Sequence, residues 1–237
     1  MLIGISGKAQ VGKDTVCKII QCLTAYKSDI ADNVISRINH PQWVLADYSP
    51  FINKKFALKV KEIASILTGI PLSDFEKEEI KNSTLGIEWT VERMPKLMEG
   101  PKGADAHYDY FKSPLTVREV LQLIGTECMR DGLHEDVWVN ALFSEYKAHK
   151  MDEYYPSNWI ITDVRFRNEL EAIKERGGIL IRVNRNTENT TYSHHYSEVA
   201  LDNYKDWDFI IDNSGDIPQL IEKVRELLKT ANILKNA

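Results

Sequence analysis

A glycine-rich run near the N-terminus constrains the fold more than any other stretch of the chain. The sequence begins MLIGISGKAQVGKDTV, in which Gly7, Gly12 and Lys13 have the P-loop spacing G-x-x-x-x-G-K. Leu2 to Ser6 is predicted as a buried strand, and apolar residues at helical spacing follow from Lys13 to about Leu23. A chance glycine-rich turn would not need this order of strand, loop and helix. We therefore expect a phosphate-binding loop, whose backbone N–H groups surround a β-phosphate at a helix N-terminus.

The loop is expected to bind ATP. Lys13 would bridge the β- and γ-phosphates and offset the charge that develops during phosphoryl transfer. The nucleotide-binding candidates in this stretch are Gly7, Lys8, Val11, Gly12, Lys13, Asp14 and Thr15.

The residue after Lys13 departs from the usual pattern. That position normally carries a Ser or Thr hydroxyl that binds magnesium, but this chain has Asp14 there and Thr15 next. A carboxylate beside a polyphosphate is repelled unless magnesium lies between them or the carboxylate turns toward the acceptor. The alternative is that Asp14 only caps the first turn of the helix. We expect a functional Asp14 and an Mg²⁺ site at Asp14 and Thr15, and leave open which way Asp14 faces.

A second cluster of charged residues follows a later predicted strand. In WIITDVRFRNELEAI, Asp163 ends the strand, and Arg165 and Glu169 stand at the start of a helix. Ligands of parallel α/β sheets bind at the carboxyl ends of the strands. Asp163 could hold a metal-bound water or receive part of an acceptor, and Arg165 could bind a phosphate through two hydrogen bonds. The alternative is a solvent-exposed helix start, which the P-loop elsewhere in the chain makes the weaker interpretation.

A polar stretch between two late strands is predicted to form a lid, over residues 184–205. Such segments supply arginines and exclude water from a transfer site, and Arg185 is the candidate here. An ordinary surface loop is the alternative. His194 and His195 have no third ligand nearby in sequence, so we do not expect a metal site there.

The order of predicted elements indicates an α/β fold with a parallel central sheet covered on both faces, that is, three layers. The predicted strands are Leu2–Ser6, Phe56–Leu58, Trp159–Asp163, Ile179–Val183 and Phe209–Ile211. Predicted helices cover Lys13–Leu23, Val60–Leu67, the segment after Ser73, Thr116–Arg130, the segment from Asp136, the segment around Leu170 and Ile173, and Ile217–Leu228. Ser73 with Glu76 and Thr116 with Glu119 have capping-box spacing. We expect one domain over residues 1–237, with a helical insertion at about 70–150 that is irregular between 84 and 114.

Composition limits the partners. The net charge of -5 gives no general attraction to nucleic-acid polymers or acidic membranes, so small nucleotides are the expected substrates. Three cysteines without metal-ligand spacing, and an N-terminus without signal-peptide features, predict a cytoplasmic protein that does not span a membrane. A homodimer stays possible.

Five segments resemble one known family. GKAQVGKDT, FALKVKEIA, TVREVLQLIGTE, VWVNALF and TDVRFRNELEAI are similar in order and spacing to the deoxynucleoside monophosphate kinases of T-even phages and their relatives. The GKDT ending and the D-x-R-x-x-x-E element are the most specific. Residues 84–114 have no match.

The resemblance implies a nucleoside monophosphate kinase fold with an acceptor-binding part and a lid. It implies reversible transfer of the γ-phosphoryl group from MgATP to a deoxynucleoside monophosphate, in the host cytoplasm if the protein is phage-encoded. Asp14, Asp163, Arg165 and Glu169 would then form the catalytic and acceptor centre. Lys61, Arg118 and Trp138 would seat the acceptor, and Asn213 would lie near the adenine; without the resemblance these are ordinary surface or core residues.

Other functions stay open at this point. A phosphomevalonate kinase of the animal type also has a GKD loop, and dephospho-coenzyme A kinase is a weaker alternative within the same class. A nucleotide-binding switch or assembly factor is the alternative from another class, although the chain lacks an N-K-x-D guanine-binding sequence.

Overall fold

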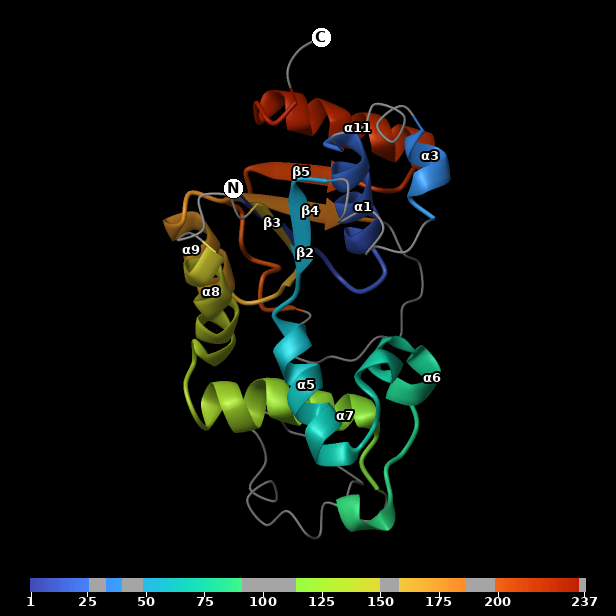
Figure 1. Cartoon of the computed structure of the whole chain (residues 1–237), viewed down its shortest axis with the longest axis vertical. Coiled ribbons are helices and arrows are strands. Elements are labelled where there is room, and N and C mark those ends of the chain that lie inside the picture. The colour runs from blue at the N-terminus through green and yellow to red at the C-terminus, as the bar shows by residue number, and fades with distance from the viewer. Residues whose placement is uncertain (26–32, 40–48, 91–113, 150–157, 186–198, 235–237) are drawn as a thin grey trace. The chain divides into compact units, whose positions relative to one another are not determined.

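The computed structural model describes residues 1–25, 33–39, 49–90, 114–149, 158–185 and 199–234 (Figure 1). These residues form two compact units, one of Met1–Phe56 with Leu142–Ala237 and the other of Ala57–Ala141. Most of the predicted lid, with His194 and His195, lies outside the described residues. Within the described part of the chain, no helix has the length and apolar character needed to cross a membrane.

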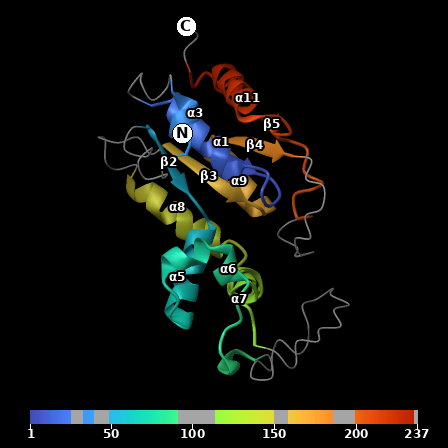
Figure 2. The same ribbon diagram turned by 90° about the vertical axis from the view of Figure 1, so that its right-hand side faces the viewer.

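The first unit contains a five-stranded parallel sheet in the order β2-β3-β1-β4-β5. Its strands are β1 (Leu2–Ser6), β2 (Phe51–Lys54), β3 (Asn158–Val164), β4 (Ile179–Asn184) and β5 (Phe209–Asp212). Figure 2 shows β2 toward one edge and β5 at the other. The residues of β1 are all buried, as expected for a central strand with both faces covered.

Helices cover both faces of this sheet. Side chains alternate between the faces of a strand, so Ile3 and Ile5 point one way and Gly4 the other. Ile3 and Ile5 join the core formed with α1 (Lys13–Leu23), α3 (Val34–Arg37) and α11 (Ile217–Thr230). On the other face, a Cβ atom at Gly4 would lie 2.8 Å from Cδ1 of Ile173 in α9 (Arg167–Glu175). The predicted three-layer α/β fold is therefore confirmed (Figure 1).

An aromatic cluster packs α8 (Val137–His149) against strand β3 in the first unit. Phe143 and Tyr146 of α8 contact the fully buried Trp159 of β3, with ring centroids 6.3 and 4.9 Å away. Phe56 contacts Phe143 in the same cluster.

The predicted second strand is wrong. The chain forms β2 at Phe51–Lys54 and then enters α5 (Ala57–Thr68), so the predicted strand Phe56–Leu58 is mainly the start of a helix. β2 is an edge strand that pairs only with β3, and only Phe51 of its four residues is buried. Its sequence FINK therefore lacks the apolar run by which a buried strand is recognised.

The second unit is helical, and α5, α6 and α7 gather within it (Figure 1). Its elements are α5, the 3₁₀ helices η1 (Leu72–Glu76) and η2 (Ile87–Trp89), α6 (Glu78–Lys81), α7 (Val117–Leu123), the π-helix η6 (Ile124–Asp131) and the first residues of α8. Residues 91–113 of the predicted irregular insertion lie outside the described part of the chain.

One of the two predicted capping boxes is present. Thr116 Oγ1 accepts from the Glu119 backbone N–H at 3.2 Å, and the Glu119 carboxylate accepts from the Thr116 N–H at 2.7 Å. The predicted box at Ser73 is wrong, because that segment is a single 3₁₀ turn that begins after Pro71 without a side-chain cap.

The cap at Thr116 provides a test of the second unit. Thr116→Ala removes the acceptor of the Glu119 N–H and should lower the free energy of unfolding by about 1 kcal/mol in urea titrations. The control is Thr230→Ala, whose exposed hydroxyl only bonds the Glu226 carbonyl one turn back and should change stability much less. Equal losses for the two variants would contradict the assignment of the cap.

Candidate active site

The two loop glycines of the P-loop pattern lie where no other residue fits. Gly12 precedes α1 in the left-handed conformation, with φ 96°, and a Cβ atom there would lie 2.5 Å from Nδ2 of Asn213. Gly7 has φ 155°, and its Cβ atom would lie 2.5 Å from the Val183 carbonyl oxygen. The loop is thus pressed against the ends of β4 and β5, which fixes its path from β1 to α1.

Lys13 folds back over this loop. Its Nζ donates to the carbonyl oxygens of Gly7 at 2.6 Å and Lys8 at 2.7 Å. The ammonium group therefore lies at the mouth of the loop, beside the N-terminus of α1. Both features favour an anion at this position.

Asn213 anchors the loop from the end of β5. Its Nδ2 donates to the Val11 carbonyl at 2.8 Å, and the residue is buried. Arg185 is exposed directly after β4, at the same edge of the sheet. Asn213 and Arg185, both predicted to bind the nucleotide, therefore follow directly the two strands against which the loop packs, β5 and β4.

The Asp14 carboxylate faces the ends of β2 and β3. Its Oδ1 lies 3.1 Å from Thr162 Oγ1, which donates to it, and 3.1 Å from Nζ of Lys55. The side chain is still 58% exposed, so one side of the carboxylate is open to a ligand.

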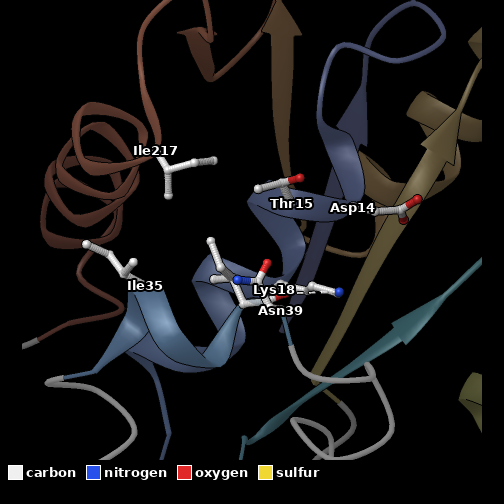
Figure 3. A pocket seen from close by; sticks show the side chains of 7 residues that line it. Asp14, Thr15, Lys18, Ile35, Asn39 and Ile217 are labelled. Carbon is white, nitrogen blue, oxygen red and sulfur yellow. Dashed lines mark hydrogen bonds between the residues drawn. The ribbon is translucent and has the colours of Figure 1, made fainter.

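Thr15, the next residue of α1, lines a pocket of about 320 Å³. The other lining residues are Asp14, Lys18, Ile35, Ile38, Asn39 and Ile217. In Figure 3 the Asp14 carboxylate points away from Ile35 and Ile217. The two predicted metal ligands are therefore neighbours in sequence that line the same pocket.

The described residues contain no group of three or more His, Cys, Asp and Glu side chains that could hold a metal ion. Magnesium commonly binds through one or two protein oxygens together with substrate phosphates and water. The carboxylate of Asp14 and the hydroxyl of Thr15, beside the P-loop, fit that requirement.

Asp163 stands at the carboxyl edge of the sheet, half-buried near the end of β3. Its Oδ1 accepts from the Phe56 backbone N–H at 3.0 Å. The contact ties the end of β3 to the segment that follows β2. Asp163 and Asp14 are thus both contacted from that segment, residues 53–56.

Glu169 points inward rather than toward solvent. The residue is 2% exposed, and its Oε2 accepts from the backbone N–H groups of Arg165 at 2.7 Å and Phe166 at 3.1 Å. These bonds cap the start of α9 and fix the backbone that carries Arg165. The carboxylate therefore acts on Arg165 through the main chain.

The three predicted acceptor residues belong to the second unit. Lys61 pairs with Glu76 at 2.6 Å, and Arg118 donates from Nη2 to Glu78 at 2.6 Å. Trp138 is buried, and its Nε1 donates to the Gly125 carbonyl at 2.7 Å. The indole N–H is satisfied within the unit, as in a core tryptophan.

Several residues of the site were missed from the sequence. Lys55 and Thr162 contact Asp14, and Asn53 contacts Thr162 in turn; the misplaced second strand concealed Asn53 and Lys55. Arg182 belongs to the polar stretch recognised from the sequence, where Arg185 was preferred as the candidate; it donates to Ser6 Oγ at 3.2 Å and to Asp202 at 3.3 Å. Asp202 lies 3.4 Å from Lys8 of the loop, so the end of the predicted lid reaches the P-loop.

Comparison with known proteins identifies relatives. The family model described as deoxynucleotide monophosphate kinase matches residues 54–224. The deoxynucleoside-5'-monophosphate kinase of Escherichia phage T5 is 31% identical over 74% of this chain and 72% of its own length. A protein of Acanthamoeba polyphaga mimivirus, named as a candidate deoxynucleotide monophosphate kinase, is 31% identical over 49% of this chain and 63% of its own length. A solved dephospho-CoA kinase from Campylobacter jejuni aligns over 97% of this chain and 96% of its own with a TM-score of 0.37 and 13% identity, a likeness too slight to bear on function.

Unfolding measurements test whether the buried Glu169 carboxylate caps the start of α9. Glu169→Ala leaves two backbone N–H groups without their acceptor and should lower the free energy of unfolding by about 1–3 kcal/mol. Glu169→Gln keeps an amide oxygen there and should recover much of that loss.

Glu171→Ala is the matched control on the same helix. It removes an exposed carboxylate that pairs with Arg167 and should cost no more than about 0.5 kcal/mol. If Glu169→Ala is as stable in urea as Glu171→Ala, the capping role is wrong.

Proposed function

Because the chain belongs to the deoxynucleotide monophosphate kinase family, we propose that it transfers the γ-phosphoryl group of MgATP to a deoxynucleoside monophosphate. The products are ADP and a deoxynucleoside diphosphate. The observation that supports this most directly is the P-loop with its lysine at the same sheet edge as Asp163. Donor and acceptor phosphates can then meet where the strands end.

The loop and its neighbours bind the donor in this proposal. Lys13 exchanges the Gly7 and Lys8 carbonyl oxygens for β- and γ-phosphate oxygens. The remaining donor contacts come from the loop N–H groups, from Lys8 and Arg185, and from the Asn213 segment near the base. Magnesium, when bound at Asp14 and Thr15, neutralises charge on the donor phosphates.

The acceptor needs positioning rather than activation. A phosphate monoester is already a nucleophile at neutral pH, so transfer depends on alignment and on cations that offset the developing charge. Asp163 and Arg165 receive the acceptor, and Glu169 holds the backbone of Arg165. Lys61 and Arg118 supply positive charge, and Trp138 shapes the acceptor part of the second unit.

The family match does not favour the alternative acceptors or a non-catalytic switch. We further propose small-molecule nucleotides as the substrates and the host cytoplasm as the place of action. A homodimer stays a prediction.

The activity is tested by incubating the protein with MgATP and a panel of deoxynucleoside and nucleoside monophosphates. Separation of the products should show ADP and a diphosphate for at least one deoxynucleotide. Mevalonate 5-phosphate and dephospho-coenzyme A serve as competing acceptors. Phosphorylation of one of these, with no diphosphate from any nucleotide, would overturn the proposal.

Lys13→Ala should lower kcat by about 10²–10³-fold, because it removes the cation nearest to the developing charge. Lys229→Ala is the control, since this lysine lies in the last turn of α11, away from the loop. Both variants should keep the far-UV circular dichroism of the unsubstituted protein. Retained activity in Lys13→Ala would exclude the loop as the donor site.

A further inference from the structure

Lys55 is a charged residue of this site to which no role has been assigned above. It follows β2 directly, and its Nζ lies 3.1 Å from Oδ1 and 3.3 Å from Oδ2 of Asp14. Its side chain is 28% exposed and that of Asp14 is 58% exposed, so the pair is shielded from solvent on the lysine side only. Such shielding strengthens the attraction compared with a fully exposed pair.

Thr162 holds the same carboxylate from another side. Its Oγ1 lies 3.1 Å from Asp14 Oδ1 and 3.4 Å from Asn53 Oδ1, so the shorter contact is the one to Asp14. Thr162 belongs to β3 and Lys55 follows β2, whereas Asp14 belongs to α1. Three elements thus fix the direction of one carboxylate.

The ion pair resolves an electrostatic problem in this loop. A carboxylate next to the P-loop lysine adds a negative charge where polyphosphate must bind, and like charges repel. A loop with Ser or Thr at that position has no such charge. Lys55 supplies the opposite charge at the carboxylate and lets Asp14 stand beside the phosphates.

The segment that carries Lys55 also holds Asp163. The Phe56 N–H donates to Asp163 Oδ1 at 3.0 Å, one residue after Lys55. Lys55 and Phe56, two consecutive residues, therefore contact the two aspartates of the site.

We propose that Lys55 is a positioning residue for phosphoryl transfer, which holds Asp14 toward the ends of β2 and β3 and offsets its charge beside the donor phosphates. This inference rests on the proposed kinase function. It predicts effects on ATP affinity as well as on turnover, because charge compensation acts as soon as the donor binds.

Lys54 offers a matched control. It precedes Lys55 and makes its own ion pair with Glu145 at 2.8 Å, beside the Trp159 ring. Lys54 is the last residue of β2 and Lys55 lies beyond the strand, and the two lysines meet different partners. Lys54→Met therefore removes the same charge and an ion pair of similar exposure, but leaves Asp14 untouched.

The experiment measures kcat and the ATP affinity, the latter by calorimetry with Mg²⁺ and without acceptor. Lys55→Met should lower kcat by about 10–100-fold, as expected for misplaced reacting groups, and should weaken ATP binding. Lys55→Arg keeps the charge and should restore most of both. Lys54→Met should stay within about twofold of the unsubstituted protein, because the ion pair that it removes is with Glu145 and not with Asp14.

Combining Lys55→Met, and separately Lys54→Met, with Asp14→Asn tests whether Lys55 acts through Asp14. The amide carries no charge, so Lys55→Met should have little further effect on ATP affinity in that background. The proposal is overturned if Lys55→Met behaves like Lys54→Met, or if its effect is as large with Asn at position 14. An unsubstituted protein that forms no diphosphate refutes the kinase function separately, because the binding measurements still decide the role of Lys55.

Discussion

The close approach of the glycine loop to the ends of β4 and β5 is the constraint on which the rest of the site depends. There is no room for a Cβ atom between Gly7 and the Val183 carbonyl, or between Gly12 and Asn213. Asn213 adds a hydrogen bond to the loop at Val11. These contacts set where α1 begins, and the start of α1 sets the positions of Lys13 and Asp14. A larger residue at either glycine would displace both charged groups at once.

Sequence patterns predicted the buried elements better than the exposed ones. β1 and α1 have the predicted bounds because a continuous apolar run and the loop glycines mark both of their ends. β2 has one buried residue and pairs with β3, whose residues lie more than a hundred positions later, so nothing local reveals it. The capping box at Thr116 was predictable because it is a local contact between two side chains and their own backbone.

The sequence predicted which residues belong to the candidate site, but it did not predict which atoms their side chains contact. Asp163, Arg165 and Glu169 were recognised from their order after a strand, yet only the structure shows that Glu169 turns inward. Trp138 likewise has its indole N–H bonded within its own unit. The direction of a side chain depends on long-range packing, which a motif does not encode. Lys55 was missed for the same reason, since its partner lies 41 residues away.

The strand order also has a consequence for synthesis on the ribosome. β1 ends at Ser6, but both of its neighbours in the sheet, β3 and β4, begin only at Asn158 and Ile179. The helical unit Ala57–Ala141 is complete before either neighbour exists. The apolar strand β1 must therefore remain unpaired until the ribosome has made β3, and in that state a sheet-forming segment is exposed to other chains. The loop packs against the ends of β4 and β5, which are made late in translation. A chain truncated before these strands would contain the P-loop sequence but could not hold the loop in its folded conformation.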